Sequence, residues 1–316
     1  VTQKGSNVAV CAIEGNFDDA QNGVKKIFAD REMKNYLNAR DMEFSSANSI
    51  NFGRLVPQIV YYVSAYCDLL RQGKLHRGER FNVAVPTGNF GNILAAVYAR
   101  EMGVPIARLI CASNRNNVLT DFIRTGVYDR NRPFYTTTSP SMDILISSNL
   151  ERMLSLLYNG DPAAVAGLME QLAQTGRYSI SPEALRKLQS EFSGGFCDDV
   201  GTAATIGATF RNYHYLCDPH TAVALNVYER YRSETGDDTP CVLASTASPF
   251  KFAAAVLPAI QSGELPGDEF GMVAKLAEVT GIPVPKPLAG LKDLPVLHTG
   301  CVTREKMNLF IRNFLG

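Results

Sequence analysis

A short run of glycine and amide residues is the strongest chemical signal in the sequence. Gly88 and Gly91 lie in the run 88–92, between an apolar segment and a small-residue segment with helical spacing. Glycines let the backbone approach a ligand closely, and a following helix turns the positive end of its dipole toward the loop, which suits a phosphate. No Lys-Ser/Thr pair follows Gly91, and the GxxG spacing differs from a dinucleotide fingerprint. Anion binding and a structural tight turn are equally compatible with these residues.

A second run, 48–54, gathers hydrogen-bond donors before an apolar helical stretch. Asn48 offers an amide, Ser49 a hydroxyl and Arg54 a guanidinium. Such groups match oxyanions, and arginine in particular matches phosphate or carboxylate. An Asn/Ser-rich helix cap beside a solvated arginine is the simpler interpretation, and the residues alone favour it.

A third run contains hydroxyl groups at the end of the apolar segment 241–244. Thr246 and Ser248 lie in this run, Ser245-Thr-Ala-Ser-Pro249. In open α/β sheets the carboxyl ends of the strands face the ligand crevice. A hydroxyl there can donate to a heterocyclic nitrogen or accept from it. A helix N-cap is the alternative, and the residues alone favour it.

Alternating strands and helices would position these three runs. The apolar segments 7–12, 81–85, 106–111 and 241–244 predict buried strands. Helical spacing predicts helices at 20–28, 55–70, 93–102, 117–124, 250–260, 268–280 and 304–314. The segment 149–232 is expected to be almost wholly helical, and the Pro-rich segment 282–296 is expected to wrap the surface. The pattern predicts an α/β fold with a mostly parallel twisted sheet, helices on both faces and a helical insertion.

Composition excludes several classes of protein. The 316 residues carry 31 Lys plus Arg and 31 Asp plus Glu, which argues against a polybasic nucleic-acid binder. No apolar run reaches the roughly 18 residues of a membrane span. The seven cysteines contain no CxxC pair, so neither a metal site nor a redox pair is indicated, and small buried thiols in a reducing compartment are expected. The sequence therefore favours a cytoplasmic protein without metal.

Several motifs, in order along nearly the whole chain, resemble threonine synthase, a pyridoxal-phosphate enzyme with the tryptophan-synthase-β-like fold. The matching runs are Glu14-Gly-Asn-Phe-Asp-Asp-Ala-Gln21, Ser46-Ala-Asn-Ser-Ile-Asn51, Val85-Pro-Thr-Gly-Asn-Phe-Gly-Asn92, Asp218-Pro-His-Thr-Ala-Val223 and Ser245-Thr-Ala-Ser-Pro-Phe-Lys-Phe252. The set is specific, although each motif alone is not. The predicted helical insertion, at about 149–215, looks like that of the longer, bacterial- and yeast-type branch of the family.

The resemblance implies a role for each run. The cofactor is pyridoxal 5'-phosphate, and its phosphate would lie on Gly88, Asn89, Phe90, Gly91 and Asn92. Thr246 would face the pyridine nitrogen. Asn48, Ser49 and Arg54, with Asn92, would hold the phosphate of O-phospho-L-homoserine. The implied reaction converts that substrate and water to L-threonine and phosphate, with the cofactor as an electron sink.

Two departures from the family pattern affect the expected chemistry. Ser248 stands where the family usually has histidine. The Phe-Lys-Asp motif that contains the family's Schiff-base lysine is absent, so no residue is assigned as catalytic. We expect Lys251 to make phosphate or structural contacts and His220 to be structural or near the site. The chain thus resembles the C-terminal part of the enzyme, and we expect this part alone to be inactive.

The missing lysine segment also shapes the expected domains and partners. Residues 1–45 are expected to be a remnant of the smaller subdomain, and 46–316 the larger cofactor-binding domain. Absent first strands would leave exposed sheet edges, so we expect a homodimer or association with the missing N-terminal part. Two other functions stay open. One is a related pyridoxal-phosphate lyase such as a threonine dehydratase, against which Ser49 and Arg54 argue. The other is a non-catalytic phosphate-binding module.

Overall fold

The computed structural model describes residues 2–15, 17–47 and 49–316, which fall into two compact units. The first unit joins Val1–Ser46 to Pro285–Gly316, and the second is Ala47–Val284. The expected division kept the C-terminal segment in the larger domain, and this was wrong. Strand β1 (Cys11–Ile13) pairs in parallel with β8 (Gly300–Val302), which joins the two ends of the chain in one unit.

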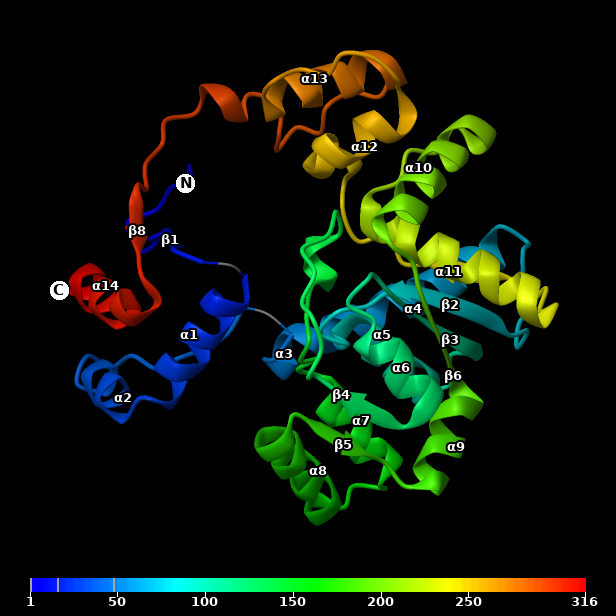
Figure 1. Cartoon of the computed structure of the whole chain (residues 1–316), viewed down its shortest axis with the longest axis horizontal. Coiled ribbons are helices and arrows are strands. Elements are labelled where there is room, and N and C mark those ends of the chain that lie inside the picture. Colours follow the sequence, from blue (N-terminus) through cyan, green and yellow to red (C-terminus); the bar gives the residue numbers. More distant parts are fainter. Residues whose placement is uncertain (1, 16, 48) are drawn as a thin grey trace. The chain divides into compact units, whose positions relative to one another are not determined.

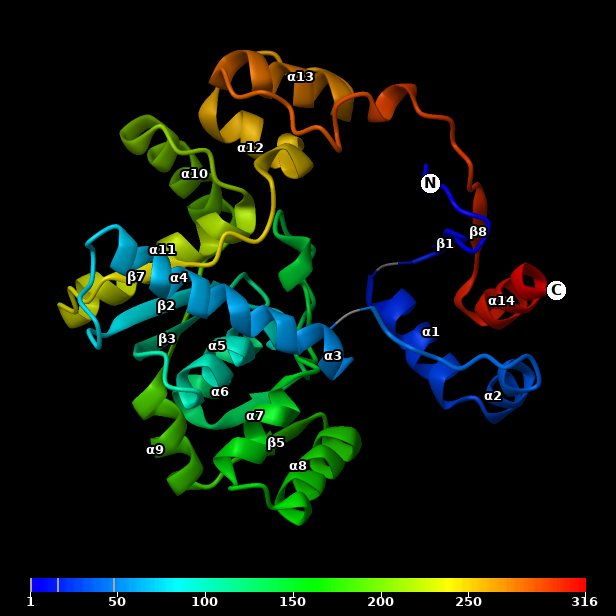
Figure 2. The ribbon, with the colours of Figure 1, turned by 180° about the vertical axis from the view of Figure 1, so that it is seen from behind.

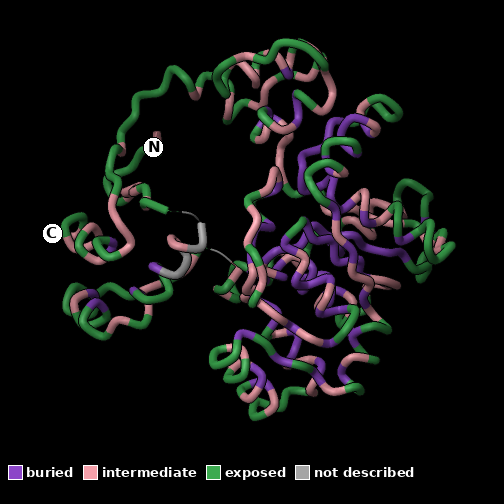
Figure 3. Tube along the Cα trace, in the orientation of Figure 1, coloured by how far each residue is buried: buried purple, intermediate pink, exposed green. Residues whose placement is uncertain are grey.

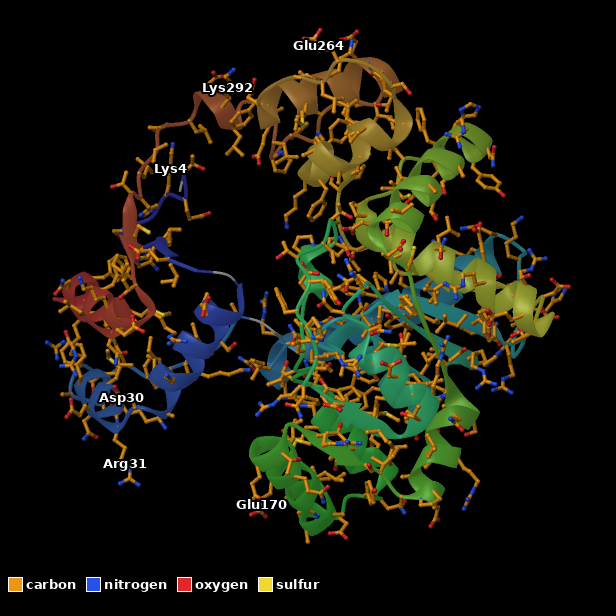
Figure 4. All side chains as sticks on the ribbon, in the orientation of Figure 1. Lys4, Asp30, Arg31, Glu170, Glu264 and Lys292 are labelled. Atoms are coloured by element: carbon orange, nitrogen blue, oxygen red, sulfur yellow. The ribbon has the colours of Figure 1, made fainter. Side chains whose placement is uncertain are left out.

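The first unit is a two-stranded sheet with helices α1 (Phe17–Ala29), α2 (Arg31–Asn38) and α14 (Met307–Leu315). Its small core contains Ile27, Met33, Leu37 and Met307. Asp30, labelled in Figure 4, caps α2 by accepting from the Glu32 N–H at 2.9 Å, and it also accepts from Asn308 Nδ2 at 2.8 Å. The buried strand expected at 7–12 is instead the short, partly exposed β1, because one partner strand cannot cover it.

A four-stranded parallel sheet forms the centre of the second unit, in the order β6-β3-β2-β7 (Figures 1 and 2). The strands are β2 (Phe81–Pro86), β3 (Ile106–Ser113), β6 (Phe192–Phe196) and β7 (Cys241–Leu243). The predicted parallel α/β sheet is confirmed. Strand β6 was missed: its sequence, Phe-Ser-Gly-Gly-Phe, has little strand propensity and forms a strand because β3 offers it an edge. The expectation of a wholly helical middle was wrong at this point.

Helices cover both faces of this sheet. Helix α11 (Pro219–Thr235) packs Val223, Ala224 and Val227 against Ala84 and Ile110 on one face. Helices α4 (Ile59–Arg71), α5 (Gly91–Glu101) and α6 (Val118–Thr125) contribute to the larger core on the other face. Figure 3 shows the central strands and α5 as the most buried part of the second unit. Each fully buried Leu, Ile or Phe side chain there stabilises the fold by about 1.5–3 kcal/mol.

The other elements of the second unit surround this core. They are α3 (Phe52–Leu55), η1 (Val56–Gln58), β4 (Val127–Asp129), η2 (Pro140–Met142), α7 (Leu150–Leu157), α8 (Pro162–Thr175), β5 (Arg177–Ser179), α9 (Pro182–Glu191), α10 (Asp199–Tyr213), η3 (Pro249–Phe252), α12 (Ala253–Ile260) and α13 (Glu269–Thr280). The first unit also contains η4 (Leu291–Asp293) and η5 (Arg304–Lys306). Strands β4 and β5 form an antiparallel pair in which Tyr128 stacks on Tyr178. The stretch expected as a helical insertion, at about 149–215, contains the strands β5 and β6 as well as helices.

Three further observations concern the expected classes of site. Within residues 2–15, 17–47 and 49–316, no helix combines the length and apolar character needed to cross a membrane. The same residues contain no group of three or more His, Cys, Asp or Glu side chains arranged to hold a metal ion. Cys111, Cys197 and Cys217 are buried as expected, whereas Cys67 and Cys301 are exposed.

Candidate functional site

The glycine run forms a tight loop between the central strand and α5. All six residues of β2 are buried, and α5 begins at Gly91. Phe90, the residue before the helix, has a φ of 63°, in the left-handed region that only glycine adopts freely. Its side chain is 1% exposed and stacks on Phe192 at 5.8 Å between ring centroids. Burial of this ring fixes the loop, so Phe90 offers a ligand only its backbone.

Hydrogen bonds turn the carbonyl groups of the loop toward the segment 147–149. The Gly88 carbonyl accepts from Ser147 Oγ at 2.8 Å. The Asn89 carbonyl accepts from the Asn149 N–H at 3.1 Å and from Asn149 Nδ2 at 2.9 Å. In a trans peptide the N–H points opposite the carbonyl of the preceding residue. The N–H groups of Asn89 and Phe90 therefore point away from the segment 147–149.

The first turn of α5 adds further unpaired N–H groups. The helix begins without a side-chain cap, and no acceptor for the N–H groups of Asn89, Phe90, Gly91 or Asn92 occurs in the described part of the chain. Unpaired N–H groups at a helix start carry partial positive charge and bind anions. The local geometry therefore favours an anion site.

Both glycines are required by close packing. A Cβ on Gly88 would lie 2.6 Å from the Ser141 carbonyl oxygen, and a Cβ on Gly91 would lie 2.6 Å from Ser49 Oγ. Neither glycine has a positive φ, so space excludes a side chain here rather than backbone conformation.

A cavity of about 280 Å³ lies over this loop. The strands β2 and β7 are parallel neighbours, so their carboxyl ends bring the loop and Thr246 to the same edge of the sheet. The residues lining the cavity include all of 86–92, Ser49, Gln58, Ser141, Met142, His220, Thr246, Ala247, Lys251 and Phe252. The structure thus brings the first and third sequence runs together, with Ser49 from the second.

A second hollow, of about 690 Å³, contains the other predicted phosphate ligands. Ser49, Asn92 and Thr246 line both hollows, and Arg54 lines only the larger one. Arg54 is exposed, its Nε donates to the Ala47 carbonyl at 3.1 Å, and it forms no ion pair within residues 2–15, 17–47 and 49–316. Asn48, the remaining residue of this set, lies outside the described residues. The shared lining residues show that the two hollows adjoin.

Tyr62, a buried residue of α4, positions Asn92. Its hydroxyl donates to Asn92 Oδ1 and, at 3.2 Å, to the Asn92 carbonyl. Burial raises the pKa of Tyr62, so its hydroxyl stays protonated and acts as a donor. With Asn92 Oδ1 held in this way, Nδ2 is left to donate to a ligand.

His220 lines the cavity in a defined protonation state. Its Nε2 accepts from the Ser141 N–H at 3.3 Å, so the proton lies on Nδ1, which donates to Asp218 Oδ1 at 2.8 Å. Asp218 is fully buried and also accepts from the His220 N–H and from Thr221 Oγ1. Burial alone would raise the pKa of Asp218, but the hydrogen bonds from His220 and Thr221 outweigh it and lower that pKa. The His220 ring therefore holds the backbone of Ser141, whose carbonyl group packs against Gly88.

Thr246 and Lys251, on either side of the start of η3, complete the lining of the cavity. Ser248 Oγ accepts from the Phe250 N–H at 3.3 Å, so Ser248 is the helix cap that the sequence offered as an alternative for this run. Thr246 is exposed beside it. Lys251, whose Nζ lies 5.5 Å from the Phe252 ring centroid, is the only charged side chain lining the smaller cavity among the described residues.

A buried carboxylate, also missed from the sequence, holds the wall segment 137–143. Asp143 Oδ1 accepts from Asn114 Nδ2 and from Thr137 Oγ1, both at 2.7 Å, and Oδ2 accepts from the Thr137 N–H at 2.9 Å. Asn114 follows the carboxyl end of β3. Polar residues at the end of a strand could have indicated this cluster, but their pairing with 137–143 has no periodic signal.

Comparison with known proteins finds relatives of this chain. A family model described as the C-terminal part of threonine synthase matches residues 221–296. Threonine synthase-like 1 of Homo sapiens is 46% identical over 255 residues, which is 80% of this chain and 34% of that protein. Threonine synthase of Pseudomonas aeruginosa is 38% identical over 252 residues, 80% of this chain and 51% of that protein.

Solved structures match nearly all of the chain. The pyridoxal-phosphate-bound threonine synthase of Brucella melitensis is 36% identical, with a TM-score of 0.75 over 98% of this chain and 60% of its own. Yeast threonine synthase is 30% identical, with a TM-score of 0.81 over 99% of this chain and 60% of its own. The chain therefore spans about a third to a half of the two curated relatives named above, and three-fifths of the solved ones.

Proposed function

We propose, since this chain belongs to the threonine synthase family, that its second unit binds pyridoxal 5'-phosphate as cofactor and O-phospho-L-homoserine as substrate. It would serve the conversion of O-phospho-L-homoserine and water to L-threonine and phosphate. The observation that carries the proposal is the loop 88–92, whose residues line a cavity together with Thr246 and whose N–H groups at 89–92 have no acceptor in the described part of the chain. Its relatives are longer than this chain, so the complete reaction is proposed for the protein that contains this unit.

The residues present fit the phosphate of the cofactor. The N–H groups of Asn89 and Phe90 and the start of α5 would hold it, because they have no acceptor in the described part of the protein. Close packing against Ser141 and Ser49 keeps the loop rigid, so little ordering entropy is lost on binding. Lys251 would add a positive charge on the open side of the cavity.

Thr246 would face the pyridine nitrogen. A neutral hydroxyl can donate to this nitrogen, whereas a carboxylate partner would hold a proton on it. When bound, the cofactor supplies an electron sink for the negative charge that develops at the substrate α and β carbons. The residues of this chain would bind the cofactor and the substrate and orient them for that chemistry.

The larger hollow would hold the substrate phosphate. Arg54, Ser49 and the Nδ2 of Asn92 point to this role, because all three line the hollow and each can donate to an oxyanion. We propose that Asn48 also binds the substrate phosphate. A dehydratase substrate carries no phosphate, so Arg54 favours a synthase over a dehydratase.

The amine that binds the cofactor covalently is proposed to come from polypeptide outside these 316 residues. No lysine of this chain lies in the family's Phe-Lys-Asp motif. The chain by itself is therefore expected to bind the cofactor without turnover. That absence also supports a second candidate, a non-catalytic phosphate-binding module, and a cytoplasmic location is proposed for either.

Equilibrium dialysis with pyridoxal 5'-phosphate and with pyridoxal tests the proposal. The loop predicts at least about tenfold tighter binding of the phosphorylated compound, roughly 1.4 kcal/mol, and competition by inorganic phosphate. Equal affinities for the two compounds would contradict the assignment of the loop. Binding of O-phospho-L-homoserine at a site separate from the cofactor, without displacing it, supports the synthase, whereas its failure to bind favours the non-catalytic module.

A further inference from the structure

Two polar residues at the start of α7 contact both of the loops that line the hollows. Asn149, which is fully buried, directly precedes the helix, and Arg152 lies in its first turn. Residues three positions apart at a helix start lie on one face, so these two side chains can meet. Arg152 Nη1 donates to Asn149 Oδ1. The pair therefore forms a unit whose further contacts lie outside α7.

Arg152 fixes which way the Asn149 amide points. An arginine side chain carries donors only, so the amide atom that it meets must be the oxygen. The same guanidinium donates through Nη1 to the Ser49 carbonyl at 3.2 Å and through Nη2 to the Ile50 carbonyl at 2.8 Å. These bonds anchor Arg152 to the backbone of the segment 49–50. They leave Nδ2 of Asn149 directed away from the guanidinium.

The nitrogen of the Asn149 amide joins the two loops. Nδ2 donates to the Asn89 carbonyl at 2.9 Å and to Ser49 Oγ at 3.0 Å. Two acceptors use both protons of the amide. Ser49 also packs on the start of α5, since a Cβ on Gly91 would lie 2.6 Å from its Oγ. The Ser49 hydroxyl is therefore held in place between Asn149 and Gly91.

The direction of this hydrogen bond determines what the Ser49 hydroxyl can do. An amide nitrogen only donates, so Ser49 Oγ accepts from Asn149 and keeps its own proton. No acceptor for that proton occurs in the part of the chain that the structure describes. Ser49 lines both hollows, as does Asn92. A ligand in either hollow would therefore meet the Ser49 hydroxyl as a donor.

We propose that Asn149, held by Arg152, is a positioning residue that orients the Ser49 hydroxyl so that it donates its proton to the substrate phosphate. The inference rests on the proposed function, because it concerns the phosphate of O-phospho-L-homoserine in the larger hollow. Neither Asn149 nor Arg152 is among the described residues that line the hollows, so both act through Ser49. The same amide holds the Asn89 carbonyl, so one side chain sets the proposed cofactor loop and the proposed substrate donor relative to each other.

Asn149→Asp tests this orientation, because it replaces only the donating amino group by an acceptor of the same size. The contact with Arg152 survives, but the Ser49 hydroxyl then donates to the carboxylate instead of the ligand. Equilibrium dialysis of the 316-residue chain with O-phospho-L-homoserine and with L-homoserine measures the preference for the phosphorylated compound. We expect that preference to fall by at least about tenfold in Asn149→Asp and in Ser49→Ala, since a hydrogen bond to a charged group is lost. Asn159→Asp, the same change at an exposed position just beyond α7, is the matched control and should leave it unchanged.

The double variant separates positioning from charge and packing. Because Asn149 acts through Ser49, Asn149→Asp should lower the preference by less than about twofold once Ser49→Ala is present. Charge repulsion or a general loss of packing would persist in the Ser49→Ala background, and that result would overturn the proposal. Arg152→Met is a second variant in case the buried aspartate prevents folding. It releases the Asn149 amide and should lower the preference in the wild-type background but not in Ser49→Ala.

The same dialysis distinguishes failure of this inference from failure of the proposed function. A wild-type chain that binds O-phospho-L-homoserine no better than L-homoserine would overturn both. A wild-type chain that prefers the phosphorylated compound, with that preference unchanged in Asn149→Asp and in Arg152→Met, would overturn the inference alone.

Discussion

The carbonyl oxygen of Ser141 lies 2.6 Å from the position that a Cβ on Gly88 would occupy. The Ser141 N–H in turn donates to His220 Nε2. Hydrogen bonds to the buried Asp218 fix His220. A rigid wall therefore packs against the loop 88–92, and the loop has no room for a side chain at Gly88.

Gly88→Ala should disturb both stability and cofactor affinity. The added methyl must displace the backbone at Ser141, so we expect a loss of about 1–3 kcal/mol in the free energy of unfolding. Dialysis should show pyridoxal 5'-phosphate binding weakened by at least about tenfold, roughly 1.4 kcal/mol. Gly167→Ala is the control, since a Cβ at Gly167 in α8 meets nothing within 4 Å. Unchanged binding in Gly88→Ala would contradict the cradle.

Tyr62→Phe should separate orientation of Asn92 from simple packing. Loss of the hydroxyl removes the hydrogen bond to Asn92 Oδ1, and we expect a loss of about 0.5–1.5 kcal/mol in stability with weaker ligand binding. Tyr61→Phe, at the exposed neighbouring position, is expected to change neither. Urea denaturation and dialysis measure both effects. Equal behaviour of the two variants would exclude a positioning role for Tyr62.

Asp218→Asn should change how stability depends on pH. The folded-state pKa of Asp218 is lowered, so its contribution is complete at pH values above the ordinary pKa of 3.8 and is lost as pH falls through the lowered value. Urea denaturation should therefore show the wild-type advantage over Asp218→Asn as constant from pH 7 to about pH 5 and smaller below about pH 4. An advantage that grows on acidification would show that the pKa is raised instead.

Lys251→Met should weaken cofactor binding in a manner that depends on salt. Its ammonium is the charged group lining the smaller cavity within the described residues, and the charge of an exposed side chain contributes modestly. We expect a loss of about threefold to tenfold at low ionic strength that shrinks in high salt. Lys74→Met, at an exposed position elsewhere in the second unit, is the control. A loss that persists in high salt would argue for a direct contact other than charge.

The apolar pattern of the sequence predicted those strands that can be recognised from a short stretch of sequence. The runs 81–85, 106–111 and 241–244 became three neighbouring strands, because a parallel sheet covered on both faces requires continuous apolar sequence. Strand β6 has the sequence Phe-Ser-Gly-Gly-Phe and depends on β3 and on Arg124, which donates to its Gly194 carbonyl, and neither is visible in a local window. The C-terminal segment was misplaced for the same reason: its partner, β1, lies almost 300 residues away in the sequence.

The candidate site likewise contains residues that the sequence identified and residues that only the structure reveals. Gly88, Ser49, Arg54 and Thr246 were identifiable because their motifs are short and contiguous, and the structure brings them around two adjoining hollows. Tyr62, Ser141 and Asn149 support these residues from distant positions in the chain. Their residue types are ordinary for a core or a turn, so only the folded chain reveals their contacts.

Amide chemical shifts at the loop test the central claim most directly. Selective ¹⁵N labelling of the asparagine and glycine residues, with titration of pyridoxal 5'-phosphate, follows Asn89, Gly91 and Asn92. The account predicts downfield shifts of these amide protons that saturate with the dialysis isotherm, because new hydrogen bonds to a phosphate form there. Inorganic phosphate should shift the same amides. Binding that leaves these amides unshifted would contradict the assignment of the loop as the phosphate cradle.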